Sequence, residues 1–114
     1  MNKGRIVLVS FPYSDLQGLK RRPGCVVSNE RYNLGSPDVI LAMITSSRRR
    51  IEQPGLGDAV IRDWEWAGLR LPSVARTGRL LVVERRLLGE SLGDLSSTDL
   101  QSVDASLRIV LDLP

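Results

Sequence analysis

Three consecutive cations, Lys20, Arg21 and Arg22, stand immediately before Pro23 and a short apolar stretch that begins at Cys25. A guanidinium group is planar and offers several N–H donors, so it can bind two oxygens of one phosphate. If Pro23 opens a strand, the sheet holds the backbone of Arg22 while its side chain faces solvent. The pattern therefore predicts a rigidly mounted phosphate-binding cation at position 22.

A second apolar stretch ends in hydroxyl side chains and is followed by more cations. Thr45 and Ser46 close this stretch, and the run Arg48–Arg50 comes just beyond it. Hydroxyl groups both donate and accept hydrogen bonds, so they complement a guanidinium around one phosphate. Because neighbouring strands of a small sheet often end side by side, we expect Arg22 and Thr45 to converge on one phosphate site.

Each of these patterns also has an interpretation without chemistry. A run of charges is usually a solvated loop, and arginines that follow an apolar strand can act as gatekeepers against aggregation. Hydroxyl side chains also suit the end of a strand for purely structural reasons. The combination of the two patterns, rather than either one alone, favours a binding site.

The charge of the chain is unevenly distributed. Residues 1–50 hold nine Lys or Arg against three acids, whereas residues 51–114 hold seven against ten. Fourteen of the sixteen basic residues are Arg, the side chain that suits phosphate best, although a GC-rich genome would produce the same bias. The basic first half favours a polyanionic partner.

The composition excludes several kinds of chemistry. The chain has no His, and Cys25 is its only cysteine, so it forms no internal disulfide and one chain cannot assemble a thiolate or imidazole metal cage. Without a His to activate it, Cys25 is interpreted as a buried small hydrophobe. We therefore expect no metal and no cofactor. Because no apolar run is long enough for a membrane helix or a signal peptide, we also expect no membrane span and a cytoplasmic location.

The elements that must position these residues are mostly strands. A length of 114 residues predicts a single domain, residues 1–114. Apolar, β-branched stretches bounded by turn residues predict strands at 5–11, 23–29, 36–47, 59–63, 73–77 and 79–84, with loops at 12–22 and 48–58. In the third strand, Val39, Leu41 and Met43 share one face with Thr45. So many short strands suggest a small barrel.

The clearest helix lies at the C-terminus. Ser96 is a suitable N-cap, with Asp99 three positions later, and apolar residues then recur at helical spacing as far as Leu111. A second stretch, 63–69, is predicted to form one helical turn between strands. Its tryptophans, Trp64 and Trp66, either pack in the core or a dimer interface, which we favour, or stack on bases.

At these residues the chain resembles the MazF/PemK family of growth-inhibiting toxins from bacterial toxin–antitoxin pairs. The stretches that carry the resemblance are GRIVLVSFPYSDLQGLKRRPGCVVSN, DVILAMITSS, DWEWAGLRLPSVAR and LGDLSSTDLQSVDASLRIVL, which follow one another in the family's order. The most specific features are the Arg-Pro step before an apolar strand and the apolar strand that ends in Thr-Ser. The resemblance covers nearly the whole chain.

The resemblance implies a mainly β fold with a C-terminal helix, a small SH3-like β-barrel of the MazF/CcdB type. It implies a homodimer whose interface groove holds single-stranded RNA, and a cognate antitoxin that neutralises it. The implied activity is a metal-independent, sequence-selective endoribonuclease that cleaves mRNA to a 2′,3′-cyclic phosphate and a 5′-hydroxyl, which would inhibit translation and growth.

Carried over residue by residue, the family's catalytic Arg and strand-end Thr fall on Arg22 and Thr45. The resemblance implies a mobile loop at 14–21 that covers RNA and contacts the antitoxin. The RNA-binding residues that we predict are Asp15, Gln17, Lys20, Arg21, Ser46, Arg48 and Arg49.

The chain departs from the family pattern at two positions. Some members have a Glu in the loop before the Arg-Pro step, where this chain has Gln17, so the group that removes the 2′-hydroxyl proton is not identified. Asp15 is the remaining acid of that loop. The family commonly follows the first glycine with an acidic residue, where this chain has Gly4 and then Arg5.

Two other functions remain open at this point. The first is a toxin of the same fold that poisons DNA gyrase by binding, although those relatives lack the Arg-Pro and Thr-Ser pair and depend on a C-terminal Trp, where this chain ends VLDLP. The second is a non-catalytic RNA-binding barrel, because Arg22 and Thr45 would serve binding as well as cleavage.

Overall fold

The computed structural model describes residues 1–11 and 20–114. In this part of the chain the strands are β1 (Arg5–Phe11), β2 (Lys20–Val26), β3 (Asp38–Thr45), β4 (Asp58–Ile61), β5 (Ser73–Glu84) and β6 (Leu88–Asp94). The helices are α1 (Glu30–Gly35), α2 (Arg48–Glu52) and α3 (Ser97–Leu111), with a short 3-10 turn, η1, at Arg85–Leu87.

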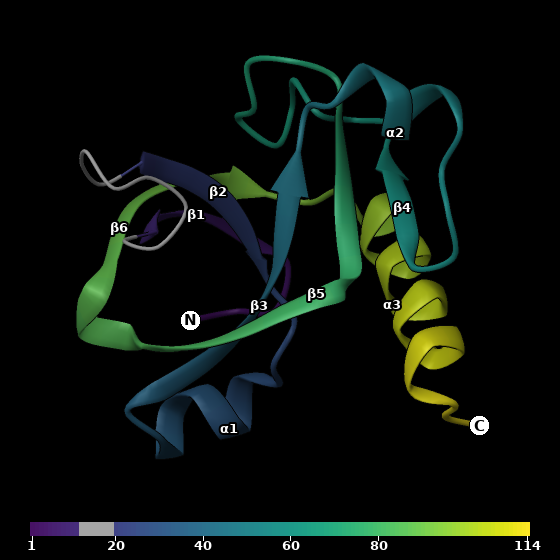
Figure 1. Cartoon of the computed structure of the whole chain (residues 1–114). Coiled ribbons are helices and arrows are strands. Elements are labelled where there is room, and N and C mark those ends of the chain that lie inside the picture. Colours follow the sequence, from purple (N-terminus) through teal and green to yellow (C-terminus); the bar gives the residue numbers. More distant parts are fainter. Residues whose placement is uncertain (12–19) are drawn as a thin grey trace.

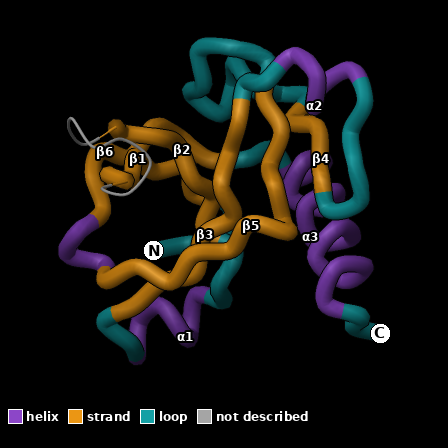
Figure 2. The backbone as a smooth tube through the Cα atoms, in the orientation of Figure 1, coloured by secondary structure: helices purple, strands orange, loops and turns teal. Residues whose placement is uncertain are grey.

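The six strands form one antiparallel sheet in the order β4-β5-β3-β2-β1-β6. The sheet curls strongly, so that β6 and β1 lie across from β3 and β5 in a barrel-like shape (Figure 1). Helix α3 packs beside β4 and β5, outside the curl (Figure 2). The expected mainly β, barrel-like fold with a C-terminal helix is therefore confirmed, although the sheet is not closed.

The central strand β3 contributes to a core on each of its faces. Val39 and Leu41 are fully buried in the cluster inside the curled sheet, whereas Ile44 is buried in the cluster between the sheet and α3. The predicted alternation of this strand is confirmed. Both faces of β3 are covered, which is why its sequence is almost continuously apolar.

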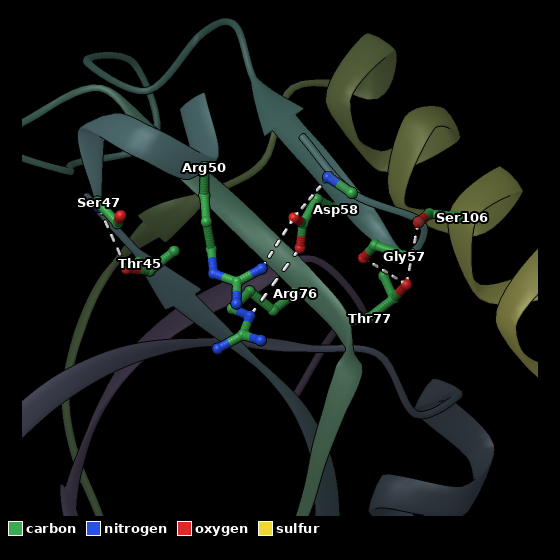
Figure 3. Close-up of polar contacts among 9 residues, drawn as sticks. Thr45, Ser47, Arg50, Gly57, Asp58, Arg76, Thr77 and Ser106 are labelled. Carbon is green, nitrogen blue, oxygen red and sulfur yellow. Dashed lines mark hydrogen bonds and ion pairs between the residues drawn. The ribbon is translucent and has the colours of Figure 1, made fainter. Parts of the chain in front are cut away.

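Strand β5 is continuous where the sequence suggested two strands. The register with β3 shifts between Ala42, which pairs with Leu80, and Met43, which pairs with Arg76. The intervening residues 77–79 form a bulge, in which the Thr77 hydroxyl donates to the carbonyl of Gly57 at 2.8 Å (Figure 3). The sequence Thr77-Gly78 resembles a turn. The hydroxyl and the backbone N–H of Thr77 both donate to the carbonyl of Gly57, and these two bonds hold the pair inside the strand.

Several predicted boundaries were wrong. Strand β2 begins at Lys20, so Pro23 lies within the strand rather than at its start. The ladder between β2 and β3 begins only at Gly24, directly after the proline that has no N–H to donate. Helix α1, helix α2 inside the predicted loop 48–58, and the polar strand β6 were not predicted, since each is short or lacks apolar periodicity.

The C-terminal helix begins as predicted and is tied to the sheet. The Ser96 hydroxyl accepts from the backbone N–H of Asp99 at 3.2 Å. The buried Asp99 carboxylate in turn accepts from the backbone N–H groups of Arg62 and Asp63, at 3.0 and 2.8 Å. This carboxylate therefore fixes the start of α3 against the chain that leaves β4.

The stretch after β4 forms consecutive hydrogen-bonded turns, and the backbone N–H of Ala67 donates to the carbonyl of Asp63 at 3.1 Å, which closes one helical turn where one was predicted. Trp64 packs against the core between the sheet and α3, which confirms packing for that residue, whereas Trp66 is 69% exposed. Within residues 1–11 and 20–114, no helix has the length and apolarity that crossing a membrane requires.

Candidate functional site

A pocket of about 420 Å³ opens where β2 begins and the antiparallel strand β3 ends. Its walls come from β1, β2, the end of β3, the turns that precede β5, the first residue of β5, and β6. The lining residues are Leu8, Arg21, Arg22, Pro23, Ile44, Thr45, Ser46, Gly68, Leu69, Arg70, Leu71, Ser73, Glu90 and Leu92.

Arg22 and Thr45 both line this pocket, as the sequence predicted. The last pair of the ladder between β2 and β3 joins Gly24 to Met43. Arg22 lies two residues before Gly24 and Thr45 lies two residues after Met43, so the same register continued outward sets the two opposite each other. The strand ends therefore bring a guanidinium and a hydroxyl to one cavity.

The backbone under the two arginines is held while their side chains remain accessible. Arg22 pairs with Val9 of β1, and Arg21 pairs with Ser10. Both arginine side chains are exposed to solvent. The strand thus fixes the backbone of both residues, and the exposed guanidinium groups can reach a ligand.

The hydroxyl edge of the pocket is shaped by a local turn. The Thr45 Oγ1 atom accepts from the backbone N–H of Ser47 at 3.2 Å (Figure 3), and Thr45 is half-buried. The Thr45 hydroxyl hydrogen remains available for donation to a ligand. Ser46 lies between these two residues, is exposed, and also lines the pocket.

Helix α2 follows this turn and is anchored by a carboxylate. The Asp58 side chain, only 4% exposed, pairs with Arg50 at 3.2 Å and with Arg76 at 3.9 Å, and accepts from the backbone N–H of Gly55 at 2.9 Å (Figure 3). Arg50, the last arginine of α2, has a structural role because it pairs with this buried carboxylate. Burial, with the neighbouring cations Arg50 and Arg79, lowers the pKa of Arg76.

The two other arginines of α2 lie outside the pocket. Arg48 pairs with Glu52 at 3.8 Å, with both side chains well exposed. Arg49 is exposed one residue further along. Neither residue lines the pocket.

The turns before β5 close one side of the pocket. Gly68 has a positive φ of 86° and approaches the backbone of Leu92 so closely that a Cβ atom would overlap its carbonyl oxygen. A Cβ on Gly93 would come to 2.5 Å from the carbonyl oxygen of Ala67. Two glycines therefore allow this segment to contact β6.

Arg70 and Glu90 are pocket residues that sequence reasoning missed. Arg70 lies in the turns before β5, and Glu90 lies in β6, whose polar sequence does not indicate a strand. With Arg21 and Arg22, the described lining carries three guanidinium groups against one carboxylate. The pocket is therefore positively charged and suits an anionic ligand.

Cys25 takes no part in this site. It is fully buried, and desolvation raises the pKa of its thiol from 9.0 to about 12. The thiol therefore stays protonated at neutral pH and is not a nucleophile. This agrees with its interpretation as a small hydrophobe.

Comparison with known proteins places this geometry in a family. Residues 2–111 match the family model described as "PemK-like, MazF-like toxin of type II toxin-antitoxin system". The chain belongs to this MazF/PemK toxin family. The predicted resemblance is thus confirmed over almost the whole chain.

Named relatives and solved structures agree with this assignment. The chain is 31% identical over 103 residues to endoribonuclease MazF6 of Mycobacterium tuberculosis and to endoribonuclease MazF2 of Mycobacterium bovis, covering 90% of this chain and 88% of each relative. Its fold matches a mycobacterial endoribonuclease solved in complex with its cognate antitoxin, with a TM-score of 0.80, 18% identity, and coverage of 100% and 97% of the two chains. It also matches the MazE-MazF complex of Deinococcus radiodurans, with a TM-score of 0.77, 19% identity, and coverage of 100% and 98%.

One departure from the MazF/PemK pattern has a structural explanation. Arg5, where the family commonly has an acid, donates from Nε to Asp94 Oδ1 at 2.8 Å and from Nη1 to Ser91 Oγ at 3.0 Å. These two bonds join β1 to β6, and neither Arg5 nor its two partners line the pocket. The other departure, Gln17, lies outside the described residues, as do Asp15 and the side chain of Lys20.

Proposed function

We propose that this MazF/PemK-family toxin is a metal-independent endoribonuclease that cleaves single-stranded mRNA at selected sequences and so inhibits translation and growth. The observation that carries the proposal is that Arg22 and Thr45 line one pocket, at the ends of neighbouring strands. The names of its relatives, endoribonucleases MazF6 and MazF2, support the same reaction class.

In the proposed reaction the substrate supplies its own nucleophile. The 2′-oxygen attacks the adjacent phosphorus, the bond from phosphorus to the 5′-oxygen breaks, and the products are a 2′,3′-cyclic phosphate and a 5′-hydroxyl. The phosphorane that forms on the way carries extra negative charge. A fixed donor aimed at such charge is worth about 3 kcal/mol in the transition state.

Arg22 and Thr45 have the chemistry that this step requires. Arg22 stabilises the phosphorane oxygens through its guanidinium fork and gives a proton to the leaving 5′-oxygen, which it regains from water. Thr45 positions the phosphate by donating its hydroxyl hydrogen, while its oxygen is held by the N–H of Ser47. Neither role requires a metal ion.

The remaining predicted residues bind the RNA on either side of the cleaved bond. Arg21 and Ser46 line the pocket and contact the phosphates beside the scissile one. Arg48 and Arg49 extend the positive surface beyond the mouth of the pocket. Lys20, the first residue of β2, and Asp15 and Gln17, which precede that strand in the chain, add further RNA contacts. Because these contacts are largely to phosphate, RNA affinity falls steeply with salt.

The toxin acts as a cytoplasmic homodimer that a cognate antitoxin neutralises. Support comes from the related mycobacterial endoribonuclease solved with its cognate antitoxin and from the MazE-MazF complex. An antitoxin segment with acidic or apolar residues, disordered until it binds, complements the positively charged pocket.

The experiment is cleavage of a mixed-sequence single-stranded RNA by the purified protein in EDTA, with the ends mapped. We expect cuts at a limited set of sequences, 2′,3′-cyclic phosphate and 5′-hydroxyl ends, and strong losses for Arg22→Ala and Thr45→Ala with unchanged circular dichroism. Arg86→Ala, an exposed arginine paired with Glu84 outside the pocket, is the matched control.

Other outcomes separate the alternatives. Cutting that survives both substitutions would reject the site, and cutting that stops in EDTA would reject metal independence. RNA binding by the parent without any cutting would favour the non-catalytic barrel. Complex formation with gyrase in the absence of RNA cleavage would favour the gyrase-binding toxin.

A further inference from the structure

We infer that Glu90 is the general base that removes the 2′-hydroxyl proton of the RNA, an assignment that rests on the proposed function. A base is required because the 2′-hydroxyl is a weak nucleophile until it loses its proton. An arginine cannot fill this role, since its guanidinium group is already protonated before the step and can only donate hydrogen bonds. The chain also has no histidine.

Glu90 stands out by elimination among the described residues that line the pocket. Their polar side chains are three arginines, three hydroxyl residues and Glu90. The arginines only donate hydrogen bonds, and a hydroxyl is too weak a base to hold the proton. Glu90 is the one carboxylate of that lining, and within 4.0 Å it makes no ion pair with a described Lys or Arg.

A β-bulge brings Glu90 to this position. Val7 pairs with Ser91 and Val9 pairs with Leu88, so one residue of β1, Leu8, faces two residues of β6, Gly89 and Glu90. Bulges of this kind redirect a side chain and are frequent beside active sites. The redirected Glu90 and the opposing Leu8 both line the pocket with Arg22 and Thr45.

A glycine makes the close approach at this bulge possible. A Cβ atom at position 89 would come to 3.1 Å from the carbonyl oxygen of Leu8, which is tighter than ordinary contact. A second register shift, between Ile6 and Val7, leaves Leu92 as the extra residue, and Leu92 also faces the pocket. The irregular part of β6 is therefore the part that forms the pocket wall.

A carboxylate in this position weakens the attraction of the pocket for a polyanion, so its presence there calls for a chemical role. In the proposed step the Glu90 carboxylate takes the 2′-hydroxyl proton as the 2′-oxygen bonds to phosphorus. The 5′-oxygen leaves with a proton from Arg22. Glu90 then releases its proton to water, and Arg22 regains one from water, so the enzyme returns to its starting state.

The test measures initial cleavage rates of Glu90→Gln, which keeps the shape and removes the base. We expect a loss of about 100-fold or more, and a smaller loss for Glu90→Asp. Glu84→Gln, which removes one exposed carboxylate outside the pocket, should cut at the parent's rate. Binding of an RNA with 2′-deoxy nucleotides at the mapped cleavage site should be as tight or tighter in Glu90→Gln, because a negative charge has been removed.

A second substrate separates a base from an acid. An RNA whose scissile 5′-oxygen is replaced by sulfur has a leaving group that needs no proton, so a variant that lacks the acid regains its rate on it. Glu90→Gln should remain as impaired on this substrate as on ordinary RNA. Two results would overturn the assignment. The first is a cleavage rate of Glu90→Gln that recovers on the sulfur-substituted RNA, and the second is a weaker RNA affinity that accounts for the whole loss of rate.

The rival carboxylate, Asp15, is tested by Asp15→Asn in the same assay. Loss in Asp15→Asn with a normal rate in Glu90→Gln would assign the base to the loop and overturn this inference. A parent protein that does not cut RNA at all would instead defeat the proposed function. The two failures are therefore distinguishable.

Discussion

The α-carbon of Gly68 lies against the carbonyl oxygen of Leu92, at a point where any Cβ atom would overlap that oxygen. The contact joins the turns before β5 to the irregular part of β6, and both segments line the pocket. Gly68 also has a positive φ, which side chains other than glycine rarely adopt. The wall of the pocket thus depends on a residue without a side chain.

Gly68→Ala should therefore destabilise the protein by about 2 kcal/mol or more, because both the backbone angle and the space are unsuitable. Urea unfolding measures the change. Gly35→Ala is the matched control, since a Cβ there meets nothing within 4 Å and alanine favours a helix. Equal stability of the two variants would show that the contact between Gly68 and Leu92 does not constrain the fold.

Arg22→Lys keeps the positive charge and removes the planar fork. We expect it to cleave RNA about 10- to 100-fold more slowly than the parent, because an ammonium cannot bind two phosphate oxygens in the geometry of a guanidinium. Arg86→Lys, made at an exposed arginine outside the pocket, should cleave RNA at the parent's rate. Cleavage by Arg22→Lys at the parent's rate would reduce the role of Arg22 to its charge.

Substitutions of Thr45 should distinguish its hydroxyl from its shape. Thr45→Val has nearly the same volume but cannot donate to phosphate or accept from the N–H of Ser47, so we expect a loss of at least 10-fold in cleavage rate. Thr45→Ser keeps the hydroxyl and should stay within a few-fold of the parent. Equal rates for the two variants, measured on the same RNA, would assign no chemical role to the hydroxyl.

Asp58→Asn should lower the free energy of unfolding by about 1–3 kcal/mol, because it leaves Arg50 and Arg76 without their partner at a site of low exposure. The matched control is Glu52→Gln, which breaks only the exposed pair with Arg48 and should change stability by less than about 0.5 kcal/mol. A similar, small change in both variants would show that the Asp58 cluster does not anchor α2.

Cys25 should make stability fall at alkaline pH. Desolvation raises the pKa of the folded thiol from 9.0 to about 12, so between these values only the unfolded chain loses the proton. The raised pKa of the folded thiol contributes stability that is fully present below pH 9. Between pH 9 and pH 12 the free energy of unfolding falls by up to about 1.4 kcal/mol for each pH unit. The difference in unfolding free energy between the parent and Cys25→Ala should therefore shrink from pH 9 to pH 11. A constant difference would contradict this.

Features with a strong local signal were predictable from the sequence. The apolar alternation of β3 predicted which residues enter each core, and the Ser96 cap with its apolar repeat predicted α3. The Arg-Pro and Thr-Ser steps predicted that Arg22 and Thr45 would meet. In each case a few adjacent residues determine the structure.

Features that depend on tertiary contacts were not predictable. Strand β6 is polar and takes its conformation from pairing with β1, including the bulge at Gly89 and Glu90. The continuity of β5 through Thr77 depends on hydrogen bonds to Gly57 and to Ser106 of α3. These contacts join residues far apart in the chain, so no local sequence pattern predicts that Glu90 lines the pocket.

The central claim, that Arg22 and Thr45 act on the same phosphate, is tested most directly by a double-mutant cycle on the rate of RNA cleavage. If the two side chains act together, the variant carrying Arg22→Ala and Thr45→Val should be only slightly slower than the slower single variant. A double variant whose loss equals the product of the two single losses would contradict the claim, because the two residues would then act independently.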